Sequence, residues 1–135
     1  MIIEEYRIRK LTLRYNSFLA MESTVCLDFE NGIVGYKSNF IDVRIFEVSE
    51  GFSLRFKHLL NQFEDYAKST LSWKPYYGAG KCIDGYYWKL TLEFVDGAIF
   101  ESRGENGKPE QFDELVERIE MIIEKPIAYR YNESQ

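Results

Sequence analysis

Apolar and polar residues alternate along several stretches of the chain, and this period of two predicts strands with one buried face. The alternation is regular over residues 23–30 and over residues 86–95. In residues 6–15 the apolar positions change phase midway. We therefore expect a β-bulge near Arg9 or Lys10, where one unpaired residue restores the register.

Two turn signals follow the regular strands, Asn-Gly at 31–32 and Asp-Gly at 96–97. Both dipeptides favour the positive φ angles of a two-residue type I′ turn, so each predicts a hairpin. In the first hairpin this turn places Phe29 opposite Val34. The strand-like residues 41–48 then either continue the return strand or form an edge strand of their own.

The same turn in the second hairpin decides which way the return strand faces. It pairs Glu93 with Phe100, so Phe100 is expected to point away from the covered side of the sheet. It also pairs the apolar Leu92 with Glu101. This mismatch means either that Glu101 lies at the rim of the sheet or that the register is wrong.

Two further stretches show the three- and four-residue spacing of amphipathic helices. The first covers residues 52–67, and the second follows Pro109 and ends before Pro126. Residues 71–85, which contain several glycines and a proline, predict a loop between the first helix and the next strand.

Strand, turn, strand and helix therefore occur twice, in residues 22–70 and 85–125. Neither unit can bury its apolar faces alone. We expect a single α+β domain over residues 1–135, with an antiparallel sheet of two hairpins plus an N-terminal strand and two helices on one face. LDFENGIVGY at 27–36 is similar to LEFVDGAIFE at 92–101, and duplication of a ββα unit is one explanation. Convergence on common hairpin sequences is the alternative.

The 135-residue chain has a formal net charge of -5, which argues against general binding to a phosphate backbone. The basic run at 7–14 is interpreted as a solvated strand face. No stretch is apolar enough to cross a bilayer and the N-terminus lacks the order of a secretory signal, so we expect a cytoplasmic protein without membrane contact. Cys26 and Cys82 are too few for a disulfide framework, and whether they form one bridge stays open.

Residues capable of catalysis or metal binding form no recognisable motif. His58 is the single histidine, and no spacing supports a nucleophile pair between it and either cysteine. Asp28, Glu30 and Glu93 are interpreted as carboxylates on solvent-facing strand positions rather than as a metal site. We therefore predict no catalytic residue, no cofactor and no bound metal.

The end of the chain carries a specific pattern. The run from Asp84 to Gly97, DGxxWKLTLEFxDG, followed by SRGENGKPEQFDEL from Ser102 to Leu115, resembles a pattern in small uncharacterised bacterial proteins, DGxxWxLxLxFxDG and then SxGxNxxPxxFxxL. The resemblance covers about a third of the chain. It implies a bacterial, cytoplasmic protein and carries no activity with it.

The motif residues are interpreted as structural. Trp88 is a core aromatic residue, while Gly104 and Asn106 shape the connection from strand to helix. The alternative is that amides of the loop at 103–108, near a helix N-terminus, hold an anion or carboxylate.

The strongest surface signal is the aromatic segment SWKPYYGAGK, followed shortly by YYW. Large amphipathic side chains of this kind are enriched at recognition hot spots. With the outward phenylalanine they form the predicted partner-binding set: Trp73, Tyr76, Tyr77, Tyr87 and Phe100. Packing of the loop aromatics against the core is the alternative.

These features favour a non-enzymatic interaction or accessory module, immunity-like or self-associating. It would bind another protein, or a second copy, through the uncovered sheet face and the 71–82 loop. One alternative is a small-ligand binder or enzyme with a pocket at that loop, using its tyrosines or Lys81. The other is single-stranded nucleic-acid binding through Arg7, Arg9 and the loop aromatics, which the net charge disfavours.

Overall fold

The computed structural model describes residues 7–17, 22–38, 44–48, 54–78, 85–123 and 127. Its elements follow one another along the chain as β1 (Ile8–Ser17), β2 (Glu22–Asp28), β3 (Ile33–Ser38), β4 (Arg44–Val48), α1 (Leu54–Ala67), the 3-10 helix η2 (Lys68–Ser72), β5 (Tyr76–Gly78), β6 (Tyr86–Phe94), β7 (Ile99–Glu105) and α2 (Phe112–Ile123).

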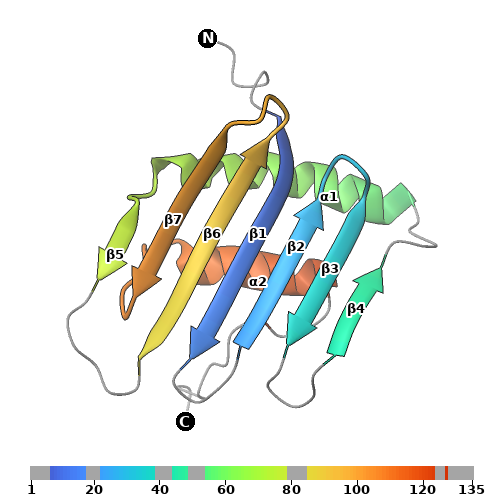
Figure 1. Cartoon of the computed structure of the whole chain (residues 1–135). Helices are drawn as coiled ribbons and strands as arrows, with labels where there is room; N and C mark the ends of the chain where they lie inside the picture. The colour runs from blue at the N-terminus through green and yellow to red at the C-terminus, as the bar shows by residue number, and fades with distance from the viewer. Residues whose placement is uncertain are drawn as a thin grey trace.

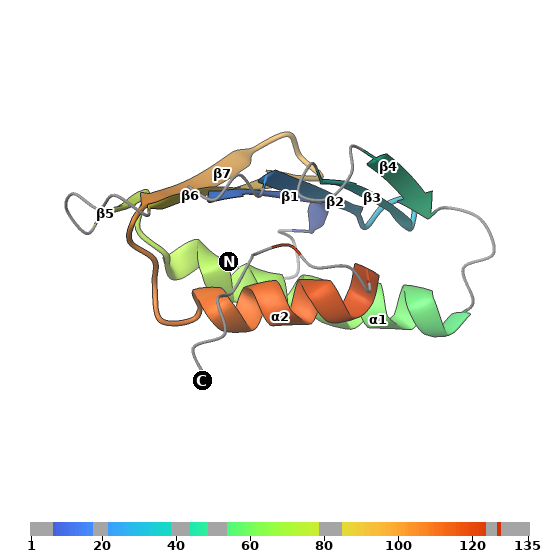
Figure 2. The ribbon, with the colours of Figure 1, turned by 90° about the horizontal axis from the view of Figure 1, so that it is seen from below.

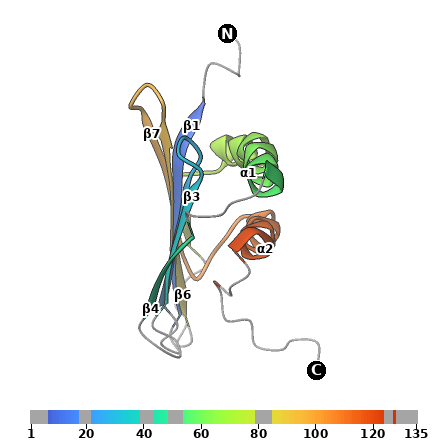
Figure 3. The same cartoon turned by 90° about the vertical axis from the view of Figure 1, so that its right-hand side faces the viewer.

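The strands form one seven-stranded sheet in the order β4-β3-β2-β1-β6-β7-β5 (Figure 1). β1 lies between the first strands of two hairpins, β2–β3 and β6–β7. Neighbouring strands are antiparallel except for β5 and β7, which are parallel. Both helices cover the same face of the sheet, as Figures 2 and 3 show. The expectation of an α+β sheet with two helices on one face is therefore confirmed.

The prediction of a purely antiparallel sheet is wrong, because the segment predicted as a loop contributes a strand. Three residues are too few for alternation to indicate β5. Backbone contacts hold it instead: the Arg103 amide donates to the Pro75 carbonyl at 3.0 Å, and the Ser102 hydroxyl donates to the Lys74 carbonyl. Within the stretch predicted at 41–48, the described residues Arg44–Val48 form β4, an edge strand of its own that pairs with β3.

The core lies between the sheet and the two helices, and it follows the alternation of the strands. Trp88 on β6 packs against Phe112 on α2 with ring centroids 4.8 Å apart, so this pair joins the two layers. The faces predicted for residues 23–30 and 86–95 are confirmed. The largest fully buried side chains are Trp88, Phe112, Ile8, Leu11, Leu13, Leu27, Leu90, Leu92, Leu115, Ile119 and Ile127.

The predicted bulge in the N-terminal strand is also confirmed. Ile8 lies opposite Phe94 and Lys10 lies opposite Glu93, so Arg9 is the extra residue. One extra residue shifts the alternation by one step. It lets Ile8 and the later apolar residues of β1 all face the helices.

The second hairpin turns through three residues rather than two. The Phe94 amide donates to the Ala98 carbonyl at 2.8 Å, and the Gly97 amide donates back to the Phe94 carbonyl at 2.9 Å. Gly97 has a φ of 95°, a conformation that glycine adopts without steric cost. A type I turn followed by a left-handed glycine is the usual three-residue hairpin loop.

This turn length reverses the predicted orientation of β7. Leu92 lies opposite Phe100, not Glu101, so Phe100 faces the helices and packs against the core. Ile99 is instead 63% exposed. The expectation that Phe100 points away from the helices is wrong, and the mismatch of Leu92 with Glu101 was the sign of the incorrect register.

The first hairpin also turns differently from the prediction, because four residues separate its strands. The Asp28 carboxylate accepts a hydrogen bond from the Asn31 amide at 2.9 Å, and this contact stabilises the longer turn. Leu27, rather than Phe29, lies opposite Val34. A shift of two residues keeps every side chain on its predicted face.

The two hairpins therefore sit on either side of β1 but return in different registers. Leu27 and Leu92 occupy matching places in the sequence echo, and both are buried. Beyond the turns the match ends, because Val34 faces the core while Ile99 faces solvent. Duplication of a ββα unit stays a prediction.

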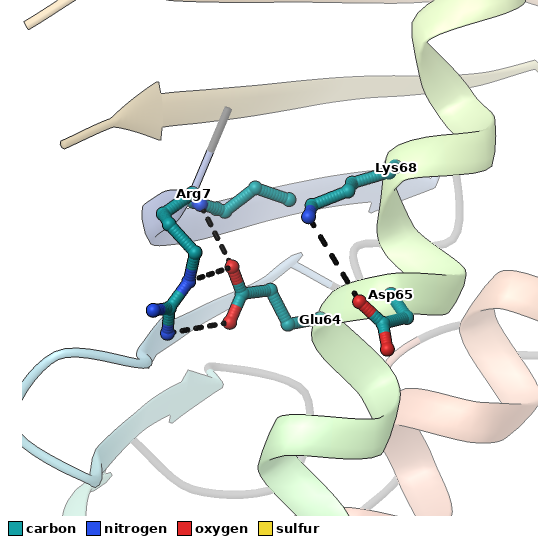
Figure 4. Close-up of polar contacts among 5 residues, drawn as sticks. Arg7, Glu64, Asp65 and Lys68 are labelled. Carbon is teal, nitrogen blue, oxygen red and sulfur yellow. Dashed lines mark hydrogen bonds and ion pairs between the residues drawn. The ribbon is translucent and has the colours of Figure 1, made fainter. Parts of the chain in front are cut away.

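A buried carboxylate links α1 to the start of β1 (Figure 4). Glu64, which is 4% exposed, accepts hydrogen bonds from Arg7 Nε at 3.1 Å, from Arg7 Nη2 at 3.3 Å and from the Ile8 amide at 3.0 Å. The hydrogen bond to Glu64 raises the pKa of Arg7 above its usual value. Glu64 thus satisfies a backbone donor beside the bulge and holds the helix over that end of the sheet.

We predict that Glu64→Ala lowers the free energy of unfolding by about 1 to 3 kcal/mol, because it leaves the buried Ile8 amide without an acceptor. Chemical denaturation of the purified variants measures this change. The matched control is Asp65→Ala, since the Asp65 side chain is 84% exposed and its ion pair with Lys68 spans 3.9 Å. The control should cost less than about 0.5 kcal/mol. Equal effects for the two variants would contradict a special role for Glu64.

Candidate functional site

Three of the five predicted partner-binding residues lie in the core or pack against it. Trp73 is 7% exposed and meets Trp88 edge to face, with ring centroids 5.8 Å apart. The Tyr77 ring lies 6.1 Å from the same indole, and its hydroxyl accepts a hydrogen bond from the Lys74 amide at 2.9 Å. Since Phe100 also packs toward the helices, these three aromatics belong to the covered side of the sheet.

The structure brings Tyr76 and Tyr87 to the opposite face, which no described element covers and which Figure 1 views directly. Tyr76 is 45% exposed, and its hydroxyl donates to Glu105 Oε1 at 2.8 Å. This hydrogen bond raises the pKa of Tyr76. The Arg103 guanidinium lies 5.3 Å from the centre of the Tyr76 ring. We call this surface the open face.

Four cations on the open face lie in one line across the strands. Arg14 on β1 is opposite Lys89 on β6, which is opposite Arg103 on β7. On its other side, Arg14 is opposite the uncharged Thr24 on β2, and Thr24 is opposite Lys37 on β3. Residues at matching register positions point to the same side of a sheet. We define the basic row as Arg14, Lys37, Lys89 and Arg103.

The rows on either side of the basic row differ from it in charge. One flank is neutral from β3 to β6, through Gly35, Cys26, Thr12 and Thr91, and it reaches Glu101 on β7. The other flank carries an acid at each end, and it runs through Glu22, Asn16, Tyr87 and Glu105. The open face is therefore a banded surface in which a line of positive charge is bordered by uncharged and acidic groups.

The cations of the basic row differ in how far neighbouring groups engage them. Lys89 Nζ lies 3.5 Å from Glu101, and Arg103 stacks on Tyr76. Arg14 and Lys37 are exposed and form no ion pair within the described part of the chain. The middle and one end of the row can thus accept an external anion without first breaking an internal contact.

The side chains considered for catalysis or metal binding do not come together in one site. They lie on opposite sides of the sheet or stabilise the fold. Cys26 is a free thiol on the open face, whereas His58 is exposed on α1 beyond the opposite face, where it contacts Gln62. Asp28 stabilises its turn, and Glu93 pairs with Arg9 at 3.5 Å. Among the described residues, no group of potential ligands could hold a metal ion. Cys82 and Lys81 lie outside the described residues.

The residues of the bacterial pattern support the fold around Trp88. Trp88 Nε1 donates to the Gly107 carbonyl at 2.9 Å, while the Asn106 side chain accepts from the Tyr86 amide at 2.9 Å. Asn106 has a φ of 59°, a region that asparagine tolerates better than most residues. Its own amide donates to the Tyr86 carbonyl, so this amide of the 103–108 loop is already engaged and the loop gains no support as an anion site.

Comparisons of the chain with protein-family models, with curated proteins and with solved structures give no match. In the part of the chain that the structure describes, no helix combines the length and the apolar character needed to span a bilayer. Inference about function therefore starts from the geometry of the open face.

The basic row was not predicted from the sequence. Its members are spread from position 14 to position 103, and each one alone is an ordinary outward residue of a strand. The only sequence signal is that each lies at a polar position of an alternating strand. Pairing register decides that they line up, and turn lengths set that register.

We predict that Gly104→Ala destabilises the fold by about 2 to 3 kcal/mol, since a β-carbon there would overlap the Gly107 carbonyl and Trp88 Nε1. The control is Gly35→Ala, a second strand glycine whose added β-carbon meets no atom within 4 Å. It should leave stability unchanged or raise it slightly. Thermal unfolding of both variants tests the pair, and a tolerated Gly104→Ala would show that the packing around Trp88 is looser than described.

Proposed function

We propose that this chain is a non-enzymatic interaction module that binds another protein through the open face of its sheet. The observation that carries the proposal is a line of four cations, three of them exposed, across a hydrogen-bonded sheet face that no described element covers. Both helices pack on the other side, where they complete the core without needing the open face. A fixed arrangement of surface charge gives specificity and register to association.

The placement of the other residues favours this proposal over its alternatives. Arg7 binds Glu64 and Arg9 pairs with Glu93, so neither arginine is free to follow a nucleic-acid strand. Trp73 and Tyr77 are used in the core, which removes aromatic side chains that a ligand pocket or a stacking surface at this loop would need. The free thiol of Cys26 supports a reducing, cytoplasmic setting for the module.

A photocrosslinking experiment tests the use of the open face. A benzophenone maleimide is attached to Cys26 in a Cys82→Ser background, and the protein is irradiated in a lysate of the source cells. The matched probe carries the same group on the exposed side of α1, through Asn61→Cys with both native cysteines replaced by serine. We expect a discrete adduct from Cys26 that the α1 probe does not give.

Competition makes this test specific for the surface. Excess unlabelled wild-type protein should abolish the adduct. Thr12→Glu, which places bulk and charge in the middle of the open face, should compete at least about tenfold less well, because a like or mismatched charge in an interface is costly. Asn61→Glu adds the same group on α1 and should compete as wild type does. Equal adducts from both probes, or full competition by Thr12→Glu, would rule out the open face as the binding surface.

A further inference from the structure

We infer that the partner surface is an acidic helix that lies across the strands and aligns a line of carboxylates with the basic row. This inference rests on the proposed function and specifies its partner. It follows from three properties of the row: the spacing of its cations, the charges beside it and the rigidity of its scaffold.

The spacing of the row matches one face of a helix. Neighbouring strands are about 4.8 Å apart, so Arg14, Lys89 and Arg103 follow one another at about that interval. Lys37 extends the row past Thr24, and the whole row covers about 19 Å. Side chains one turn apart on a helix are about 5 to 6 Å from each other. Same-side residues of an extended strand are about 6.8 Å apart, and that mismatch accumulates with every step.

The flanking charges distinguish a protein from a nucleic acid. Glu101 and Glu105 on β7 border the basic row on its two sides, and Glu22 borders it on β2. A phosphate backbone carries only negative charge and would be repelled by these carboxylates. A helix can carry acids along one stripe and neutral or basic residues beside it, so it can complement the row and its borders together.

The row is also held in place before binding. Each cation stands on a different strand, and the hydrogen-bonded ladder fixes the relative positions of β3, β2, β1, β6 and β7. The stacking of Arg103 on Tyr76, whose hydroxyl is bound to Glu105, restricts one end of the row further. A scaffold that is ordered in the free protein lowers the entropy lost on association.

Fluorescence anisotropy with defined probes tests the inference. The first probe is an alanine-based peptide of about 20 residues, long enough to be helical, with glutamates at four-residue intervals along one face. The second has the same composition, with the glutamates spread around the helix. The third is an oligothymidylate of about 20 nucleotides. All three are measured against the intact chain at the same low ionic strength, because exposed ion pairs are screened by salt.

We expect the one-sided peptide to bind several times more tightly than the spread peptide and the oligonucleotide. Arg14→Gln should weaken its binding about two- to fivefold, the range of one exposed ion pair. Lys108→Gln removes the same charge from the connection to α2 and should leave binding unchanged. Unfolding curves for both variants verify that they remain folded.

Three results would overturn the inference. The two peptides could bind equally well, or Arg14→Gln and Lys108→Gln could have equal effects. The oligonucleotide could also bind most tightly and lose affinity with Arg14→Gln, which would assign the row to phosphates. If no probe binds while the Cys26 crosslink persists, the acidic helix is wrong and the proposed function stands. If no probe binds and the Cys26 crosslink is also absent, both the acidic helix and the proposed function are wrong.

Discussion

The rest of the structure depends on how the start of β1 is anchored beside its bulge. Ile8 and the apolar residues of β1 after Arg9 can all face the core only because one extra residue changes the phase of the strand. Glu64 meets the amide of Ile8 from the helix layer and so secures the strand on one side of that irregularity. Since β1 pairs with both hairpins, the register established there extends across the sheet. A single buried carboxylate thus couples the helix layer to the alignment of the strands.

Much of this fold could be predicted from local patterns. Alternation identified the buried faces of β2 and β6, and the change of phase indicated a bulge near Arg9 or Lys10, because burial imposes a period of two on any half-covered strand. The one-sided placement of the helices followed from the polar faces of the strands. The structural use of Trp88, Gly104 and Asn106 was also predictable, since glycine allows close packing and asparagine tolerates a positive φ.

What could not be predicted depends on non-local or short contacts. Asp96-Gly97 is compatible with turns of two or three residues, and the longer one is the turn that lets Phe100 pack against the core. β5 is defined by hydrogen bonds to β7 and not by any periodicity of its own. The burial of the loop aromatics also depends on contacts with residues outside the loop. Trp73 and Tyr77 pack beside Trp88, which lies on β6. The open face was predicted as a surface, but its banded charge was not.

The basic row runs at right angles to the strands. The residues proposed to bind a partner are therefore different from the residues that form the core. Its members come from distant parts of the chain, and each occupies an outward position directly after a buried residue. Arg14 and Lys37, which have no ion pair within the described residues, can be exchanged without disturbing the packing beneath them. Related chains could therefore diverge in the pattern of charge they display, one codon at a time, while the scaffold beneath stays the same.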